Sequence, residues 1–445
     1  MFRSKEFQRS VMPLIIINSI FCTGLLEYFA NWIIRIIGFA YVISCFVFYN
    51  ISFFTLKSML GNYIESLESE LIKIIIICQY FNNDFIYLIV IFNGLTRRKL
   101  IKLFIEQMEI CTRGMDELKV PENYSSLSRY QCIVGVFLSF VILGLYLGEV
   151  LSLYEAKLYI DNYLILMIYC VYFNPLIVMT ITDFTFLFWI RYIKIKFVQL
   201  NAVLQSMLTT TIDSPQHKRV LKMKDNWEDD SSLSTHYGTY KAYENLAKLK
   251  RVKQIHLELM KCASILNEAY GLQILISIFS SVTYITTTFY NLYFTFFINK
   301  YHNWIKELYV HFYYILYYGI KVFALTNICQ TTITERCKYI LIFLIFFLYA
   351  VNTGEILYEL YEPSTSKKFR EEVGNNFYLY LIRDFMYQSI QNRLKFTVCG
   401  FYDLDHTLIY SVIGSIITYL VILLQVGDKP KLLFNNAIHN LTSRM

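Results

Sequence analysis

Charged residues are scarce in this chain: they make up 17% of its 445 residues, while hydrophobic residues make up 56%. A soluble protein of several domains needs more charge than this to cover its surface. The composition therefore excludes a soluble multidomain protein and indicates an integral membrane protein.

Motifs for common enzyme chemistries are also missing. The sequence has no glycine-rich nucleotide loop, no His-Glu metal motif and no nucleophile elbow. Its ten cysteines are scattered, and no two have the Cys-x-x-Cys spacing of a metal site. We therefore expect no enzyme activity, no cofactor, no zinc site and no disulfide framework.

The basic residues do not form a patch of the kind that binds nucleic acid. The net charge of +7 is modest and lies between the hydrophobic segments, as in proteins oriented by a membrane surface. The sequence also lacks internal repeats and paired Gly/Pro-interrupted helices, which argues against a secondary transporter. At the amino end, Arg3, Lys5 and Arg9 precede an apolar run, but no cleavage site follows, so we expect no signal peptide.

Seven segments are apolar over the roughly twenty residues that a helix needs to cross a bilayer. We predict an all-α polytopic membrane protein with spans near residues 32–54, 74–94, 130–152, 162–190, 270–296, 309–330 and 407–426. Basic residues gather at the amino end and in the second, fourth and sixth loops. By the positive-inside rule, the amino end is cytoplasmic and the carboxyl end extracellular. This orientation is the reverse of that of a G-protein-coupled receptor.

The predicted spans divide the chain into seven regions. These are an amino end with a pre-span helix (1–31), spans one to four (32–190), a cytoplasmic loop (191–269), spans five and six (270–330), a second cytoplasmic loop (331–406), span seven (407–426) and an extracellular tail (427–445).

Both cytoplasmic loops contain segments that require separate interpretation. In the first loop, residues 209–240 are polar and are predicted to be disordered, while 191–207 and 245–267 have helical spacing and extend the neighbouring spans. These extensions either pack together as an anchor or stand as two solvated stalks. In the second loop, the thirteen apolar residues 339–351 are short for a span and are typical of a re-entrant or interfacial segment.

The seventh span carries its polar residues on one face. Ser411, Ser415, Thr418, Ile422 and Gln425 follow one another in steps of 4, 3, 4 and 3, which at helical pitch forms a single stripe. Such a stripe does not face lipid. It either packs against another helix or lines an aqueous path.

Within this span, Thr418-Tyr419, five apolar residues and Gln425-Val426 resemble the carboxy-terminal signature of insect gustatory receptors. The preceding stretch, 396–408, is also similar to that family, which usually has Phe where Val426 stands. The resemblance implies a ligand-gated non-selective cation channel, assembled as a homo- or hetero-tetramer around the seventh helices. The pore or gate residues it implies are Ser411, Ser415, Thr418, Tyr419, Ile422, Gln425 and Val426.

Ionisable residues at membrane depth are candidates for function because they are costly there. Asp183 and Lys321 lie at similar depths, and we weigh mutual pairing against a functional role for them. Asp84 is less easily paired. Asp84 is therefore a candidate for ligand binding, together with a set of polar and aromatic residues in the outer halves of spans three to six. That set is Tyr146, Glu149, Tyr172, Asn174, Thr287, Tyr290, His311 and Tyr314. Interface or packing roles are the alternative for each.

The sequence thus predicts a gustatory receptor for a small tastant, with cations and membrane lipid as further partners. Sugar receptors of the family often carry an acidic residue after Thr-Tyr, whereas Leu420 is apolar here, which favours a bitter-type or other non-sugar ligand. The alternatives are a G-protein-coupled-type receptor and an odorant or pheromone receptor of the related insect family. The resemblance implies the plasma membrane of gustatory neuron dendrites as the location.

Overall fold

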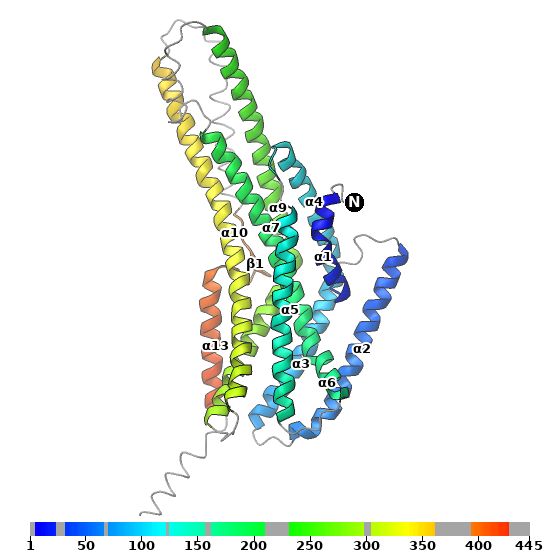
Figure 1. Cartoon of the computed structure of the whole chain (residues 1–445). Helices are drawn as coiled ribbons and strands as arrows, with labels where there is room; N and C mark the ends of the chain where they lie inside the picture. Colours follow the sequence, from blue (N-terminus) through cyan, green and yellow to red (C-terminus); the bar gives the residue numbers. More distant parts are fainter. Residues whose placement is uncertain are drawn as a thin grey trace, which may run out of the picture.

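The computed structural model describes residues 5–23, 32–65, 70–121, 124–155, 162–209, 231–297, 304–360 and 393–426. This part of the chain is nearly all helical (Figure 1). The helices are α1 (Lys5–Ile20), α2 (Trp32–Glu65), α3 (Glu70–Thr96), α4 (Arg98–Glu117), α5 (Tyr124–Glu155), α6 (Asn162–Ile168), the π-helical turn η2 (Tyr169–Phe173), α7 (Asn174–Thr209), α9 (Ser231–Phe297), α10 (Trp304–Leu360) and α13 (His406–Val426). Two short strands, β1 (Thr397–Val398) and β2 (Tyr402–Asp403), precede α13.

Seven helical segments in the described residues are long and apolar enough to cross a membrane, which confirms the predicted number. They are Ile36–Met59, Glu70–Thr96, Tyr124–Gly148, Leu166–Met207, Ala247–Phe294, Leu308–Lys338 and His406–Val426. Each overlaps one predicted span. The segments alternate in direction along the bundle, so the start of α1 and the end of α13 lie toward opposite ends of it (Figure 1).

The helices α7, α9 and α10 extend well past the membrane-spanning bundle. α9 alone has 67 residues, about 100 Å at 1.5 Å per residue, against about 30 Å of bilayer core. The predicted helical extensions 191–207 and 245–267 are confirmed as parts of α7 and α9.

Two sequence predictions about the loops were wrong. Residues 231–240, expected to be disordered, form the first turns of α9, because adding turns to a helix that is already packed costs little. Residues 210–230 of the same predicted linker lie outside the described part. Residues 339–351 continue α10, so the re-entrant alternative for this segment is wrong, since no proline or turn interrupts the helix between Trp304 and Leu360. The interfacial alternative stays a prediction.

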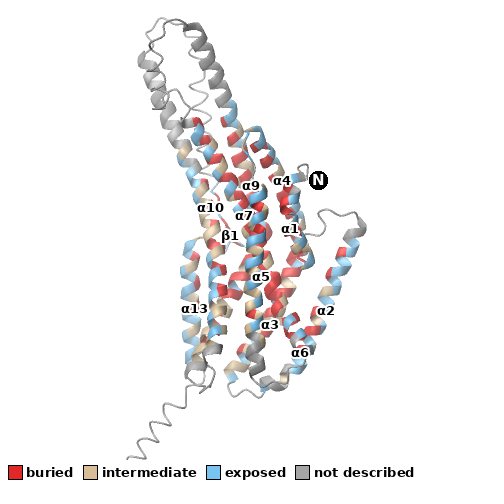
Figure 2. Ribbon diagram, in the orientation of Figure 1, coloured by how far each residue is buried: buried red, intermediate tan, exposed pale blue. Residues whose placement is uncertain are grey.

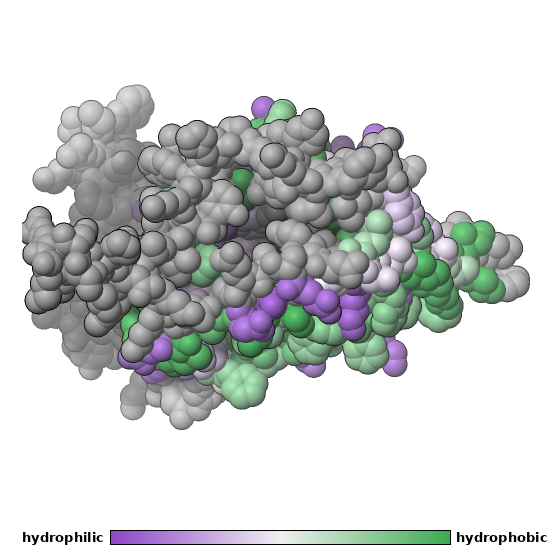
Figure 3. Space-filling model, turned by 90° about the horizontal axis from the view of Figure 1, so that it is seen from below, coloured by the Kyte–Doolittle hydropathy of each residue, from purple (hydrophilic) through white to green (hydrophobic). Residues whose placement is uncertain are grey.

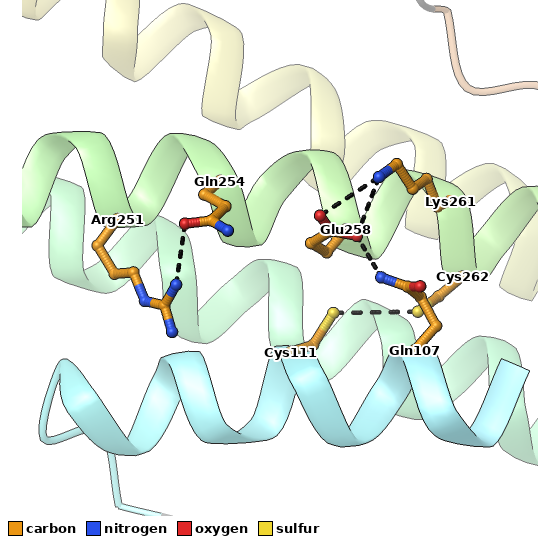
Figure 4. A network of polar contacts seen from close by, with 7 residues as sticks. All are labelled: Gln107, Cys111, Arg251, Gln254, Glu258, Lys261 and Cys262. Atoms are coloured by element: carbon orange, nitrogen blue, oxygen red, sulfur yellow. Dashed lines mark hydrogen bonds and ion pairs between the residues drawn. The ribbon is translucent and has the colours of Figure 1, made fainter.

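Polar contacts join α4 to the extended part of α9 (Figure 4). Gln107 on α4 donates a hydrogen bond to Glu258 on α9, which also pairs with Lys261 at 3.2 Å. The buried thiols of Cys111 and Cys262 lie beside this contact, with their sulfur atoms 3.9 Å apart. About two turns further along α9, Arg251 pairs with Glu117 of α4 at 2.7 Å.

The outer faces of the spans expose large apolar side chains. Phe54 on α2, Phe92 on α3 and Phe140 on α5 are all exposed, whereas the centre of the bundle is buried (Figure 2). Apolar side chains also dominate the right-hand edge of the molecule when it is seen from below (Figure 3). An apolar exterior over several spans is the surface expected of a protein surrounded by lipid.

A π-helical turn precedes the Asn174-Pro175 pair. Pro175 lacks a backbone N–H and cannot continue the regular helical ladder. The turn η2 ends at Phe173, two residues before Pro175, and the Asn174 N–H donates to the carbonyl of Tyr169, five residues back. This turn re-aims the side chains of 169–173 at the junction of α6 and α7.

A β-hairpin leads into α13 and fixes it to the bundle. β1 and β2 pair antiparallel, with Thr397 opposite Asp403, and Gly400 adopts a φ of 77° in the turn. Asn267 on α9 accepts a hydrogen bond from the Thr397 N–H at 3.0 Å. Asp405 then caps α13 by accepting from the Thr407 N–H at 2.8 Å.

Candidate functional site

A buried ion pair lies deep between α7 and α10. Lys321 Nζ is 3.1 Å from Asp183 Oδ2, and the exposed fractions of the two side chains are 8% and 4%. Ser277 on α9 donates to the same carboxylate oxygen at 2.6 Å. Of the two alternatives weighed for Asp183 and Lys321, the structure shows mutual pairing, and the contact ties three helices together.

A polar stripe on α3 faces the interior of the bundle. Tyr80, Asn83, Asp84 and Tyr87 follow helical spacing and lie on one side of the helix. Tyr80 and Tyr87 are buried, and each stacks on a ring from α2: Tyr80 on Phe53 at 4.2 Å and Tyr87 on Tyr49 at 3.8 Å between ring centroids.

A second set of stacked rings meets this stripe from α9 and α10. The Tyr284 hydroxyl donates to Asn83 Oδ1, and its ring stacks on Tyr318 at 4.8 Å. Tyr314 lies one turn from Tyr318, with ring centroids 6.4 Å apart. Lys321 Nζ lies 5.6 Å from the centroid of the Tyr318 ring, which connects these rings to the ion pair. We call the rings of Tyr49, Tyr80, Tyr87, Tyr172, Tyr284 and Tyr318 the tyrosine cluster.

Polar atoms within this region lack partners in the described part of the chain. The Asp84 Oδ1, Tyr49 hydroxyl and Asn83 Nδ2 atoms are buried without a hydrogen bond. No ion pair among the described residues includes Asp84. Unmatched buried polar atoms are costly, and an ionisable side chain at membrane depth is a candidate for function.

The structure brings together about half of the residues predicted to bind ligand. Asp84 lies on the α3 stripe, and Tyr172 is 6.2 Å from Tyr80 between ring centroids. Asn174 lies near the side chain of Tyr87. Thr287 accepts a hydrogen bond from Gln79, also on α3, at 2.7 Å. Tyr314 is connected to the tyrosine cluster through its ring contact with Tyr318.

The remaining candidates lie apart from the α3 stripe. Tyr146 packs edge-on against Tyr169 and Phe173, 5.7 and 5.2 Å away between ring centroids. Tyr290 is buried near Tyr293. His311 is half-buried on α10, with no described contact to the tyrosine cluster. The side chain of Glu149 lies outside the described part.

Several residues of the tyrosine cluster escaped prediction from the sequence. Tyr49, Tyr284 and Tyr318 look like ordinary aromatic residues of apolar spans. Tyr80 and Tyr87 had a detectable signal, because they flank Asp84 at the spacing of one helical face.

The predicted pore stripe on α13 does not pack against the described helices of its own chain. The buried residues of α13 are Leu408, Val412 and Ile416, which face α9 and α10. Most of the stripe and both of its neighbours Tyr419 and Val426 are exposed, Val426 by 71%. Figure 2 shows α13 largely exposed along its length.

The hydroxyls of the stripe bond to their own helix. Ser415 donates to the Ser411 carbonyl at 2.9 Å and Thr418 to the Gly414 carbonyl at 2.8 Å. These bonds leave the hydroxyl oxygens facing outward as acceptors. Gln425 is exposed near the end of the helix. The stripe is therefore accessible to water or to another chain. The alternative that it packs against another described helix of the same chain does not apply.

Three hollows in the described part lie away from the tyrosine cluster. One groove of about 510 Å³ separates α1 from α5, and another of about 560 Å³ separates α2 from α3 on their apolar side. A third, of about 400 Å³, lies between α10 and the β-hairpin and is lined by charged residues. The rings of the tyrosine cluster pack on one another at stacking distance, so a ligand that enters there displaces one or more of them.

Comparison with known proteins agrees with this architecture. The structure of the insect olfactory receptor OR5 from Machilis hrabei superposes with a TM-score of 0.54 at 13% sequence identity, covering 94% of this chain and 98% of that one. The structure of the same receptor in complex with eugenol matches with a TM-score of 0.49 at 12% identity, over 94% and 98% of the two chains. No curated protein matches the sequence. The family model described as 7tm Chemosensory receptor matches residues 16–429, and since this is nearly the whole chain, the protein belongs to the seven-transmembrane chemosensory receptor family.

Proposed function

We propose that the chain is a gustatory receptor subunit that forms a ligand-gated, non-selective cation channel for a small, bitter-type tastant. The observation that carries this proposal is the polar stripe of α13, which is turned away from the rest of its own chain. Four copies arranged around their α13 helices would enclose these stripes and give the hydroxyls an aqueous path. Cations are the permeant species, and membrane lipid surrounds the assembly.

The family consists of chemosensory receptors rather than enzymes, and the apolar helices make the chain a multi-pass membrane protein. The plasma membrane of a gustatory neuron, with the amino end inside and the carboxyl end outside, is part of the proposal. The basic residues between spans support that orientation.

Ligand binding is proposed at the tyrosine cluster and Asp84. The cluster joins α2, α3, α9 and α10, so a ligand that separates its rings changes how these helices pack. A ligand shifts the equilibrium only as far as its affinities for the two states differ. Because α13 packs on α9 and α10, a shift in these helices is transmitted to the stripe.

Two experiments test the proposal. Whole-cell recording from cells that express the chain, with a panel of bitter compounds, should give ligand-dependent cation currents. A glycan acceptor added beyond the natural Asn440-Leu-Thr442 sequon should be glycosylated if the carboxyl end is outside. An unmodified tail, with an equally cytoplasmic amino end, would rule out the seven-crossing channel.

An odorant receptor is the second candidate, and the fold shared with an insect olfactory receptor favours it. The two functions differ in ligand rather than in mechanism. Adding volatile odorants to the same recording panel separates them, because a gustatory receptor should respond to the soluble bitter compounds and an odorant receptor to the volatile ones. A G-protein-coupled mechanism is opposed by the charge pattern and is tested by the location of the carboxyl end.

A further inference from the structure

The groove of about 510 Å³ between α1 and α5 opens toward the lipid-facing side of the bundle. Pro13 and Ile17 of α1 line one side of it, Val136 and Phe140 of α5 line the other, and the buried Phe184 of α7 also contributes. Val136 and Phe140 are exposed, so an apolar chain can enter the groove from the surrounding lipid. We call this hollow the α1–α5 groove.

The length of the α1–α5 groove matches one leaflet of a bilayer. On α5 its lining runs from Gln131 to Leu143, a distance of about 18 Å at 1.5 Å per residue. Half of the hydrocarbon core of a bilayer is about 15 Å thick. A methyl group added to Gly135 would meet no atom within 4 Å, so the middle of the groove is open. The groove therefore has the length and the apolar lining for one acyl chain.

A hydrogen bond joins α1 to α5 at one end of the groove. Gln131 Nε2 donates to the Ser10 carbonyl at 2.8 Å. Nearer the starts of both helices, the rings of Phe7 and Tyr124 meet edge-on, with centroids 6.2 Å apart. The two helices therefore run in the same direction along the groove (Figure 1). Residues just before Ser10 and just before Gln131 consequently lie at the same level.

Two arginines stand at this level. Arg9 precedes Pro13 by four residues and Arg129 precedes Cys132 by three, so each lies on the groove side of its helix. Both side chains are exposed, and neither forms an ion pair within the part of the chain that the structure describes. Among the described carboxylates, Glu6 is the nearest to them in sequence, so this end of the groove has a surplus of positive charge.

The depth of the two arginines selects the kind of anion. The apolar part of α1 begins at Arg9, and the span in α5 begins at Tyr124, so the arginines lie where both helices enter the apolar layer. Phosphate groups of lipids occupy this depth, and basic sites beside membrane helices bind such headgroups. Guanidinium groups pair with phosphate oxygens through two parallel hydrogen bonds.

The surplus charge also selects among phospholipids. Arg191 of α7 adds a further cation nearby, with its guanidinium carbon 4.1 Å from the centroid of the Tyr130 ring. A zwitterionic headgroup would bring its own ammonium group close to these cations, whereas an anionic headgroup brings no such repulsion. In the orientation proposed above, this end faces the cytoplasm, and the cytoplasmic leaflet carries the anionic lipids.

We propose that the α1–α5 groove binds one anionic phospholipid, with an acyl chain along the groove and the phosphate between Arg9 and Arg129. The bound lipid links the amino-terminal helix α1 to α5 from the membrane side. The site does not depend on the proposed tastant or on channel activity. Only the choice of leaflet rests on the proposed orientation.

Native mass spectrometry of the purified full-length chain in detergent tests the proposal. The lipid probes are phosphatidylglycerol and phosphatidylcholine with identical acyl chains, and the soluble probe is glycerol 3-phosphate. Phosphatidylglycerol should bind about tenfold more tightly than phosphatidylcholine. Glycerol 3-phosphate, which has no acyl chain, should not displace the lipid at an equal concentration. Equal binding of the two lipids would show only general contact with lipid, and displacement by glycerol 3-phosphate would show a site for free phosphate. Either result would overturn the proposal.

Matched charge variants locate the phosphate. Arg9→Gln and Arg129→Gln each remove an exposed charge and should weaken phosphatidylglycerol binding by about tenfold, with phosphatidylcholine binding unchanged. Arg393→Gln is the control, because it removes an exposed arginine that lines the hollow beside the β-hairpin instead of this groove. It should leave binding within about twofold of the parent. Equal weakening by all three variants would reduce the effect to net charge and overturn the site.

A filled groove locates the acyl chain. Gly135→Leu places a side chain in the open middle of the groove while both arginines remain, and phosphatidylglycerol binding should weaken by about tenfold. Gly61→Leu makes the same change on α2, where an added methyl group also meets no atom within 4 Å, and should leave binding unchanged. The unfolding midpoints of the lipid-free variants show that both are folded. Undiminished binding by Gly135→Leu would place the lipid elsewhere and overturn the groove as its site.

Discussion

Lys321 and Asp183 form an ion pair in the centre of the bundle, 3.1 Å from nitrogen to oxygen, and both side chains are almost completely buried. A single uncompensated charge at this depth is far more costly than the pair. The pair therefore holds α7 and α10 against each other. Asp84, beside the neighbouring tyrosine cluster, has no ion-pair partner among the described residues.

Removing one member of the pair should destabilise the protein strongly. Asp183→Leu leaves the Lys321 ammonium unpaired, and we expect a loss of about 3–5 kcal/mol and little folded protein at the cell surface. Combining Asp183→Leu with Lys321→Met removes both charges and should recover much of this loss. Detergent-solubilised thermal unfolding and surface labelling measure both. If the double variant is no better than the single one, the pair is not the main source of the loss.

A close backbone contact at Gly94 should not tolerate a larger residue. A methyl group at this position of α3 would lie 3.1 Å from the Thr23 carbonyl carbon and oxygen, which belong to backbone and cannot rotate away. Gly94→Ala should cost about 1–3 kcal/mol in the free energy of unfolding. Gly135→Ala on α5 is the control, because no atom lies within 4 Å of its added methyl group. Equal unfolding midpoints for the two variants would contradict the contact.

Asp84 should determine the response to positively charged ligands. A half-buried carboxylate among tyrosine rings attracts a protonated amine through charge and through the ring faces. We expect Asp84→Asn to reduce sensitivity to an aromatic amine such as phenethylamine by about tenfold or more. Sensitivity to 2-phenylethanol, which has the same skeleton without the charge, should change far less. Currents in whole-cell recording measure both responses.

The control for this experiment is Glu70→Gln, which removes an exposed carboxylate at the start of the same helix and should leave both responses unchanged. If Asp84→Asn affects the amine and the alcohol equally, the side chain has a structural role only.

Val426 and Gln425 should control conduction at the end of α13. Val426→Ala reduces the apolar bulk that closes the path by dewetting, so basal leak should rise, and Gln425→Ala should change the single-channel conductance. Ile413→Ala is a matched control, because it shortens an exposed apolar side chain two residues from Ser411, on the opposite face of the helix. Unchanged leak and conductance in both pore variants would remove these residues from the pore.

The sequence by itself determined the membrane-spanning character and the number of spans. Each span is a local property, because a helix that crosses lipid needs about twenty consecutive apolar residues and satisfies its backbone internally. The stripe on α13 was predictable for the same reason, since the positions of Ser411, Thr418 and Gln425 on one helix follow from helical pitch alone.

Only the tertiary structure decided which side chains meet. Tyr284 and Tyr318 lie 34 positions apart and become neighbours through the rotation and depth of two helices, which no local pattern specifies. The Asp183–Lys321 pair was one of several open possibilities until the helices were placed. The hollow between α10 and the β-hairpin likewise depends on where the hairpin packs. Local periodicity determines the helices and their faces, whereas contacts between distant segments depend on the packing of all helices together.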